Sequence, residues 1–254
     1  MLNLVDLTDR RILVTGGSSG IGKATAILLS QLGAKVILVA RRENLLQEAI
    51  GQLEGEGHAY YAADLTQLDD IAALVKKIVE EQGKLDGLVH AAGITLDLPM
   101  TTYSPEKVEN IFKINYFSFF ELVRQATKKN RFNPGMRIVG LSSIAAFLGN
   151  RAQTQYTASK AAMNAAIRCM ANELSDKGIC INTIAPGMVN TQMYGNYLQR
   201  YGGEASDVNT RLLGRQYLGI IEPVHIGNAI AFLLSPAAKY ITGITLTVGG
   251  GLIP

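Results

Sequence analysis

The sequence predicts an α/β protein built on a parallel sheet, and three observations support this fold class. Residues 11–22, RILVTGGSSGIG, are typical of a short buried strand that runs through a glycine-rich turn into a helix. Apolar strand-length runs and helix-length segments alternate along the rest of the chain, as in sheets covered by helices on both faces. The chain has 254 residues, 48% of them hydrophobic, so it can bury a substantial core. No repeat or linker divides it, and residues 1–254 are predicted to form a single domain.

Composition and charge exclude several functional classes. The formal net charge is only +3, with both signs scattered, so no field favours nucleic acid or an anionic membrane, and we expect a small-molecule partner. Cys169 and Cys180 form no Cys-x-x-Cys pair and the three histidines lie far apart, which argues against a metal site or a disulfide framework. Charged residues interrupt the N-terminal segment early, and no apolar run reaches the roughly 18 residues of a membrane span. We expect a cytoplasmic protein without a membrane segment.

The glycine-rich turn after the first strand predicts a phosphate site. A helix that starts at such a turn presents unpaired backbone N–H groups and the positive end of its dipole, and glycines let the backbone approach the ligand closely. The spacing is Gly16-x-x-x-Gly20-x-Gly22 rather than the commoner Gly-x-Gly-x-x-Gly of dinucleotide sites. A simple Gly/Ser turn between a strand and a helix is the alternative interpretation.

Two arginines follow the second predicted strand, residues 35–40, at the place where nucleotide sites of this kind select their cofactor. An acid there usually binds the ribose 2′-hydroxyl of NAD, whereas an arginine accommodates the 2′-phosphate of NADP. This chain carries Arg41 and Arg42, and Glu43 already belongs to the next helix. The pair predicts NADP; the alternative is that both side chains face solvent at the start of that helix.

The middle of the chain continues to alternate between helices and strands. We expect a helix at 44–54, a strand at 58–62, a helix at 68–81 and a strand at 87–90. Asp64 follows the third strand, where its carboxylate either caps the next helix or binds an adenine amino group. After the fourth strand, Ala92 and Gly93 belong to a turn small enough for a cofactor to lie against it. His90 is expected to hydrogen-bond the local backbone rather than to take part in chemistry.

A long helix is predicted over residues 105–129, with apolar residues around much of its circumference. One face covers the sheet and another needs a partner, which predicts a subunit interface. The fifth strand, residues 136–141, follows this helix and ends at Ser142 and Ser143. These serines therefore lie at the carboxyl edge, where open α/β sheets bind ligands.

Tyr156 and Lys160 lie four residues apart in a predicted helix that runs to about residue 177, so both are on one face. An ammonium beside a phenol favours the phenolate, so we expect the pKa of Tyr156 to lie below its ordinary value of about 10. Such a tyrosine exchanges a proton at neutral pH. The Tyr-x-x-x-Lys pattern occurs in many helices, and a purely structural role is the alternative.

The alternation stops after a strand at 179–184, over residues 188–219. A loop of this length in a compact domain is usually a lid or a binding loop, so we expect a substrate lid here. Its Met, Tyr and Leu residues indicate an apolar pocket. A helix at 224–234 and a last strand at 242–248 complete the chain.

In their order and spacing, the motifs resemble those of the short-chain dehydrogenase/reductase family over essentially the whole chain. They are Thr15-Gly16-x-x-x-Gly20-x-Gly22, Asp64, Ala92-Gly93, Asn115, Ser143, Tyr156-x-x-x-Lys160 and Pro186-Gly187. The ending KYITGITLTVGGG is similar to that of 3-oxoacyl-(acyl-carrier-protein) reductases and related carbonyl reductases. The resemblance implies a single-domain, Rossmann-like, doubly wound sheet of seven parallel strands flanked by helices, with NADP across the strand ends. It also implies a homotetramer, because relatives pair through the two long helices.

The resemblance implies a role for each catalytic residue. Tyr156 is the general acid that gives a proton to a carbonyl oxygen, and Ser143 hydrogen-bonds the same oxygen. Lys160 binds the nicotinamide ribose and lowers the pKa of Tyr156, and Asn115 holds a water that joins Lys160 to solvent. Thr191 contacts the nicotinamide carboxamide. The full set of expected cofactor residues is Gly16, Ser18, Ser19, Gly20, Ile21, Gly22, Arg41, Arg42, Asp64, Leu65, Ala92, Gly93, Tyr156, Lys160, Pro186, Gly187, Val189 and Thr191.

We therefore expect an NADP-dependent oxidoreductase that reduces a ketone to a secondary alcohol, with a 3-oxoacyl group as one candidate substrate. The alternative is a non-catalytic NADP-binding sensor or scaffold on the same fold, against which the complete set of catalytic residues argues. Enoyl reductases of related fold space their tyrosine and lysine more widely, which favours carbonyl chemistry here. The predicted apolar pocket suits fatty acyl, steroid and aromatic ketones alike.

Two places depart from the family pattern. His90 and Ala91 replace the Asn-Asn that often precedes Ala-Gly. Arg168 is basic, as in many reductases of carrier-bound substrates, but Asn172 stands where an arginine is often found. An acyl carrier protein is therefore a candidate partner: Arg168 argues for it and Asn172 argues against it.

Overall fold

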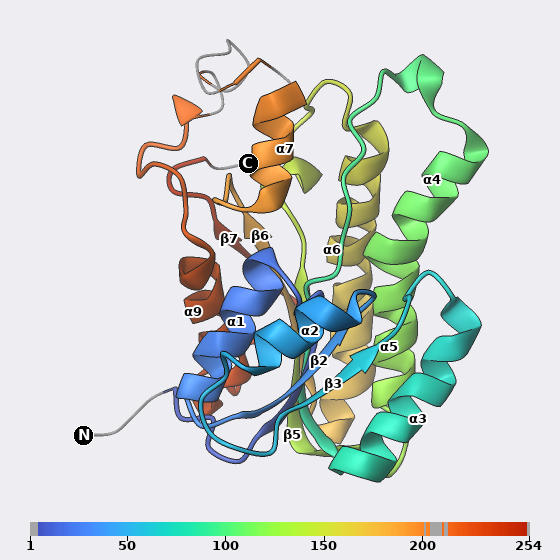
Figure 1. The fold of residues 1–254 in the computed structure, drawn as a ribbon. Helices are drawn as coiled ribbons and strands as arrows, with labels where there is room; N and C mark the ends of the chain where they lie inside the picture. The colour runs from blue at the N-terminus through green and yellow to red at the C-terminus, as the bar shows by residue number, and fades with distance from the viewer. Residues whose placement is uncertain (1–4, 201, 204–209, 211–212, 253–254) are drawn as a thin grey trace.

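In the computed structural model, which describes residues 5–200, 202–203, 210 and 213–252, seven parallel strands form one sheet in the order β3-β2-β1-β4-β5-β6-β7 (Figure 1). The strands are β1 Arg11–Thr15, β2 Lys35–Ala40, β3 Ala59–Ala62, β4 Leu85–His90, β5 Phe132–Leu141, β6 Cys180–Pro186 and β7 Thr245–Val248. The predicted doubly wound sheet is confirmed. The strand order reverses between β1 and β4, and in open α/β sheets ligands bind at the carboxyl ends beside such a reversal.

Helices cover both faces of the sheet (Figure 1). The helices on one face are α1 Gly20–Gln31, α2 Glu43–Ile50 and α9 Pro223–Leu234, and those on the other are α3 Ile71–Gln82, α5 Ser118–Ala126 and α6 Thr154–Leu174. Strand β1 shows how the core divides, because Leu13 packs on the α3 side while Ile12 and Val14 pack on the α1 side. Each strand of this kind is apolar along its length because both of its faces are buried.

The long helix predicted at 105–129 is divided by a π-helical turn. It consists of α4 Pro105–Phe112, the π-helical turn Lys113–Phe117 and α5. In the turn the backbone N–H of Ser118 bonds the carbonyl of Lys113, while the Ser118 hydroxyl donates to the Ile114 carbonyl at 2.7 Å. The extra residue per turn places Asn115 inside the protein, where its side chain is fully buried.

Several predicted boundaries shift for identifiable reasons. Helix α2 ends at Ile50 rather than at 54, because the backbone N–H of Glu54 bonds the Ser30 hydroxyl of α1 at 3.0 Å. Strand β7 begins at Thr245 rather than at 242, because the Asn182 side chain bonds the backbone of residues 241 and 244 in place of a regular ladder.

The expected loop at 188–219 contains a helix, so that expectation is wrong for α7, Gln192–Arg200. The Thr191 hydroxyl accepts a hydrogen bond from the backbone N–H of Tyr194 at 3.4 Å, which helps to start this helix. Residues 201, 204–209 and 211–212 of the expected lid lie outside the described residues. Within the described residues, no helix has both the length and the apolar character that a membrane crossing requires.

Candidate active site

A cavity of about 400 Å³ opens at the carboxyl edge of the sheet, beside the reversal between β1 and β4. All of the expected cofactor residues except Asp64 line it, Tyr156 and Lys160 included. Of the other two expected catalytic residues, Ser143 lines the cavity and Asn115 does not. The segment after β4, the segment before α6 and helix α7 enclose one part of the cavity, which we call the α7 end. Its lining residues are Thr95, Asp97, Leu148, Asn150, Gln153, Tyr194 and Tyr197.

The glycine-rich turn forms a cradle that side chains would fill. Gly16 has a φ of +67°, and a Cβ on it would come within 2.8 Å of the Ala91 and Ala92 backbone. A Cβ on Gly22 would lie 2.3 Å from the Gly16 carbonyl oxygen. Helix α1 starts at Gly20 with no side-chain cap on its N-terminus and no acidic residue in its first turn. The open N–H groups fit a phosphate, so these residues suit the pyrophosphate of a dinucleotide.

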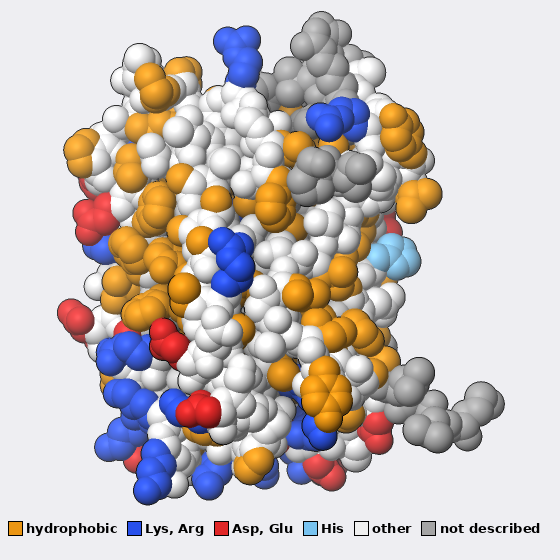
Figure 2. All heavy atoms as spheres, turned by 180° about the vertical axis from the view of Figure 1, so that it is seen from behind, with side chains coloured by type: hydrophobic (Ala, Val, Ile, Leu, Met, Phe, Trp, Pro, Cys, Tyr) orange, Lys and Arg blue, Asp and Glu red, His pale blue; other side chains and the backbone are white. Residues whose placement is uncertain are grey.

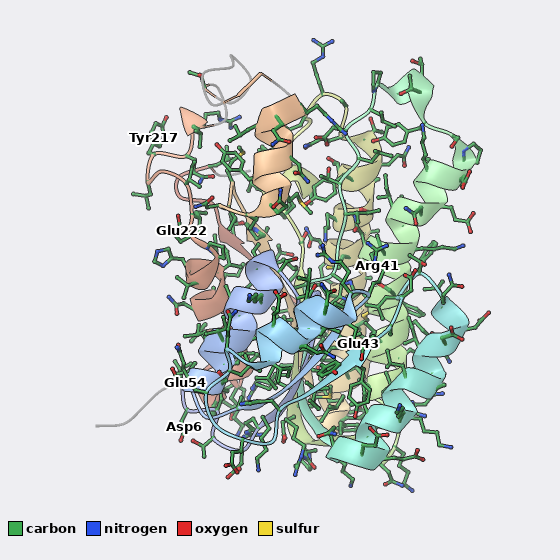
Figure 3. All side chains as sticks on the ribbon, in the orientation of Figure 1. Asp6, Arg41, Glu43, Glu54, Tyr217 and Glu222 are labelled. Carbon is green, nitrogen blue, oxygen red and sulfur yellow. The ribbon has the colours of Figure 1, made fainter. Side chains whose placement is uncertain are left out.

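Arg41 and Arg42 both line the cavity and both are exposed. Figure 3 shows Arg41 and Glu43 close together at the start of α2. None of the ion pairs among the described residues involves either arginine. Both guanidinium groups are therefore available to a ligand phosphate at this end of the cavity.

Asp64 does not line the cavity. Its Oδ1 accepts hydrogen bonds from the backbone N–H of Thr66 at 3.0 Å and from the Thr66 hydroxyl at 2.9 Å. The carboxylate thus holds the turn after β3 and does not cap the next helix, which Gln67 precedes, so the expected capping role is wrong. The neighbouring Leu65 lines the cavity, as expected.

Tyr156 and Lys160 lie together on α6, as their spacing predicts, with the Lys160 Nζ 5.9 Å from the centre of the Tyr156 ring. The expected lowering of the Tyr156 pKa is wrong for this structure. Burial raises the pKa of Tyr156 above 10, a hydrogen bond with Ser143 lowers it in part, and the charge of Asp97 raises it. The Lys160 ammonium does not lower it, because Nζ donates to the Leu141 carbonyl at 2.7 Å; burial lowers the pKa of Lys160 itself to about 8.

Asn115 lies behind the cavity rather than on its wall. Its Nδ2 donates to the Ile94 carbonyl and to the Ser159 hydroxyl, both at 3.0 Å, and its Oδ1 accepts from the Ile94 N–H at 2.9 Å. A Cβ on Gly93 would lie 3.2 Å from Asn115 Oδ1 and 3.3 Å from Lys160 Nζ. Asn115 therefore fixes the chain just after Gly93 against the helix that carries Lys160.

His90 bonds a side chain rather than the local backbone, which corrects the sequence-based expectation. Its Nδ1 lies 3.0 Å from the Thr15 hydroxyl, and that hydroxyl accepts a hydrogen bond from the Ala92 N–H at 3.3 Å. The Thr15 hydroxyl thus bonds the His90 ring and the Ala92 backbone at the same time. Burial, and to a smaller extent the charge of Lys160, lowers the pKa of His90 to about 3. Thr15 and His90 together join the ends of β1 and β4.

This depressed pKa predicts acid sensitivity of the fold. The unfolded chain binds a proton at His90 near pH 6.5, whereas the folded protein does so only near pH 3, so stability is complete above pH 6.5 and is lost as the pH falls toward 3. Between pH 7 and pH 5 we expect His90 to reduce the free energy of unfolding by about 2 kcal/mol. Urea unfolding at both pH values tests this, with His90→Gln as the variant that cannot titrate. An equal loss in both proteins would contradict the assignment.

Several residues that line or support the cavity gave no signal in the sequence. Asp97 and Gln153 are joined across the α7 end by a hydrogen bond at 3.2 Å. Gln216 is almost fully buried, and its side chain bonds the N–H and the carbonyl of Met188 at 2.8 and 3.0 Å. Gln216 thereby ties the far end of the expected lid to its start. No local pattern marks these residues, because their partners are distant in sequence.

The comparisons with known proteins agree with this geometry. A family model described as "Enoyl-(Acyl carrier protein) reductase" matches residues 16–253. The 3-oxoacyl-(acyl-carrier-protein) reductase FabG of Vibrio cholerae is 36% identical over 98% of this chain and 99% of its own. A short-chain dehydrogenase/reductase from Serratia marcescens superposes with a TM-score of 0.89 at 25% identity, covering 98% of this chain and 100% of its own. A blue fluorescent protein from a metagenomic library, solved with NADPH, has the same TM-score and coverage at 28% identity.

Proposed function

Because the chain belongs to the short-chain dehydrogenase/reductase family, we propose that it is an NADP-dependent oxidoreductase that reduces a ketone to a secondary alcohol, with Tyr156 as the general acid. One observation carries the proposal. Tyr156, Ser143 and Lys160 line the same cavity as the glycine cradle and the two arginines. The groups that would move a proton and the groups that would hold a dinucleotide therefore share one site.

Different groups of cavity residues would bind different parts of the cofactor. The cradle from Gly16 to Gly22 would hold the pyrophosphate, and Arg41 with Arg42 would hold the 2′-phosphate. The turn at Ala92 and Gly93, with the residues that follow β6, would hold the nicotinamide end. When bound, NADPH supplies a hydride to the carbonyl carbon.

The proton comes from the protein. Burial keeps the Tyr156 hydroxyl protonated at neutral pH, which is the form that a general acid needs at the start of a reduction. Ser143 and Tyr156 present two hydroxyl groups to one carbonyl oxygen and stabilise the negative charge that develops on it. Lys160 lies beside Tyr156 and would bind the nicotinamide ribose. Its positive charge would then favour the transient phenolate.

The spacing of Tyr156 and Lys160 favours carbonyl reduction over enoyl reduction, which the description of the matching family model names. Enoyl reductases of related fold place the two residues further apart. The curated relatives at 32–38% identity are 3-oxoacyl-(acyl-carrier-protein) reductases, so a 3-oxoacyl thioester is our first candidate substrate. A thioester bound to an acyl carrier protein would need a basic surface on which the carrier can dock. Arg168 would contribute a positive charge to such a surface and Asn172 would not. A non-catalytic NADP sensor is the alternative.

A substrate screen tests the proposed function. NADPH oxidation is followed by its absorbance with 3-oxoacyl thioesters, carrier-free and carrier-bound, and with aliphatic, aromatic and steroid ketones. Turnover of any of these ketones supports the proposal. Tight NADPH binding without turnover of any of them would favour the sensor.

We also propose that the chain acts as one catalytic domain in which the segment at about 188–219 closes over the substrate. Helix α7 contributes Met193, Tyr194 and Tyr197 to the cavity wall. The Arg200 side chain of α7 donates to the Asp97 backbone carbonyl at 3.1 Å, which links this helix to the segment after β4. An apolar wall of this kind suits the carbon skeleton of a ketone.

We predict a homotetramer. Hydrophobic side chains gather on the face seen in Figure 2, on the side where α4 and α6 lie. Phe117 and Phe120 are 39% and 45% exposed and lie close together in the sequence, and an exposed apolar patch of this kind marks an interaction site. Light scattering at micromolar concentration should give four times the chain mass, and Phe120→Glu should lower it. A monomer mass for the unmodified protein would contradict the prediction.

A further inference from the structure

The α7 end of the cavity contains a buried carboxylate that the proposed chemistry does not use. Asp97 is only 7% exposed and lines the cavity together with Tyr156. Its Oδ1 accepts hydrogen bonds from the Thr95 hydroxyl at 2.9 Å and from Gln153 Nε2 at 3.2 Å. Its Oδ2 has no hydrogen bond to any residue that the structure describes. The side chain is therefore held in place while one of its oxygens is left for a ligand.

Neither of the nearby cations neutralises this carboxylate. Arg200 bonds the backbone carbonyl of Asp97 rather than its side chain, and its own side chain is exposed to solvent. Lys160 donates to the Leu141 carbonyl and lies beside Gly93. Among the described residues, no cation lies within 4.0 Å of the Asp97 carboxylate oxygens. The negative charge of this largely buried side chain thus has no cation beside it.

We propose that Asp97 makes the α7 end a subsite for uncharged ketones and against ketones that carry a carboxylate or a phosphate near the carbonyl. This specificity rests on the proposed function, because it assumes that the substrate carbonyl lies at Tyr156 and Ser143. A substituent next to that carbonyl would then extend toward Asp97, because Gln153, which bonds Asp97 at 3.2 Å, lies only three residues before Tyr156. Two negative charges close together beside a side chain that is only 7% exposed repel each other, whereas an ester, an amide or a thioester incurs no such penalty.

The hydrogen bonds to Asp97 also explain why the fold tolerates a carboxylate at this buried position. The Thr95 and Gln153 donors replace part of its lost hydration, so the buried charge is stabilised before any substrate arrives. A neutral substrate with an N–H or O–H group supplies a further donor for Oδ2. An anionic substrate supplies none and adds a second charge.

A thermodynamic cycle tests the proposal without turnover. Benzoylformate and its ethyl ester differ by one negative charge next to the same ketone, and neither is reduced when the protein is loaded with NADP⁺. Their dissociation constants are measured by NMR titration at pH 7.5 for the unmodified protein and for Asp97→Asn, which keeps the shape of the side chain. Glu106→Gln removes the same charge from an exposed position on α4 and is the matched control.

We expect the ratio of the acid's dissociation constant to the ester's to fall at least tenfold in Asp97→Asn and to stay unchanged in Glu106→Gln. Asp97→Ser should give the same result. This agreement would show that the change in the ratio comes from the lost charge and not from the amide group of the introduced asparagine. An unchanged ratio in both Asp97 variants would overturn the proposal, even if both ligands bound more weakly, since that would indicate a structural role. Because no turnover is measured, failure of the proposed reductase activity would appear separately, in the NADPH oxidation screen.

Discussion

Tyr156→Phe is expected to lower kcat for ketone reduction by about 10²–10⁴-fold while leaving the affinity for NADPH nearly unchanged. The substitution keeps the ring and its packing on α6 and removes only the hydroxyl. The protein loses both its proton donor and one of the two groups that stabilise charge on the carbonyl oxygen. Steady-state kinetics and titration of NADPH fluorescence measure the two quantities on the same samples.

Two further variants separate this effect from a general loss of structure. Tyr61→Phe removes a hydroxyl outside the cavity, where it donates to Glu81 at 2.7 Å, and should leave kcat unchanged. Lys160→Ala should weaken both turnover and cofactor binding, because Lys160 is proposed to hold the ribose as well as to assist Tyr156. If the folded phenylalanine variant reduced its best ketone at nearly the original rate, Tyr156 would not be the general acid.

Arg41→Asp is expected to reverse the order of cofactor affinities, from NADPH over NADH to NADH over NADPH. A charge-assisted contact with the 2′-phosphate is worth about 1.5–3 kcal/mol, so the unmodified protein should prefer NADPH at least tenfold. The aspartate removes that contact, repels the phosphate and offers a carboxylate to the ribose hydroxyls of NADH. Dissociation constants for both cofactors measure the change.

Lys76→Asp is the matched control for this reversal. It changes the net charge by the same amount at an exposed position on α3, outside the cavity, and should leave the ratio of affinities unchanged. Equal affinities for NADPH and NADH in the unmodified protein would indicate that Arg41 and Arg42 only face solvent.

The sheet and most of the cavity could be predicted from local patterns. A buried parallel strand is apolar along its length, and a phosphate cradle needs glycines at fixed places, so β1 and the turn after it are visible in the sequence. Ser143 and Tyr156 could be placed because each follows or occupies a strongly patterned element. The resemblance to a known family then supplied their roles.

The rest of the site depends on contacts between segments that are distant in the sequence. Asp97 and Gln216 lie in stretches without periodicity, and only the fold brings them to Gln153 and Met188. Helix α7 was missed because it is only nine residues long and carries Gly195 in its interior, although Met193, Tyr194 and Tyr197 have helical spacing and all line the cavity. The pKa of Tyr156 was predicted in the wrong direction because burial, which a sequence does not reveal, has the largest effect on it, and Lys160 bonds the Leu141 carbonyl instead.

The contact between the turns that follow β1 and β4 affects how tightly an intact dinucleotide would bind compared with its two separate halves. The Gly16 backbone lies against the Ala91 and Ala92 backbone, and the Thr15 hydroxyl bonds the Ala92 N–H, so each turn holds the other in place. A fragment such as 2′,5′-ADP at one turn would find the other already in its final place. Joining that fragment to a nicotinamide nucleotide then confines the second half at a high effective concentration, with little ordering of the protein left to oppose it. The intact dinucleotide should therefore bind far more tightly than its two separate halves would suggest.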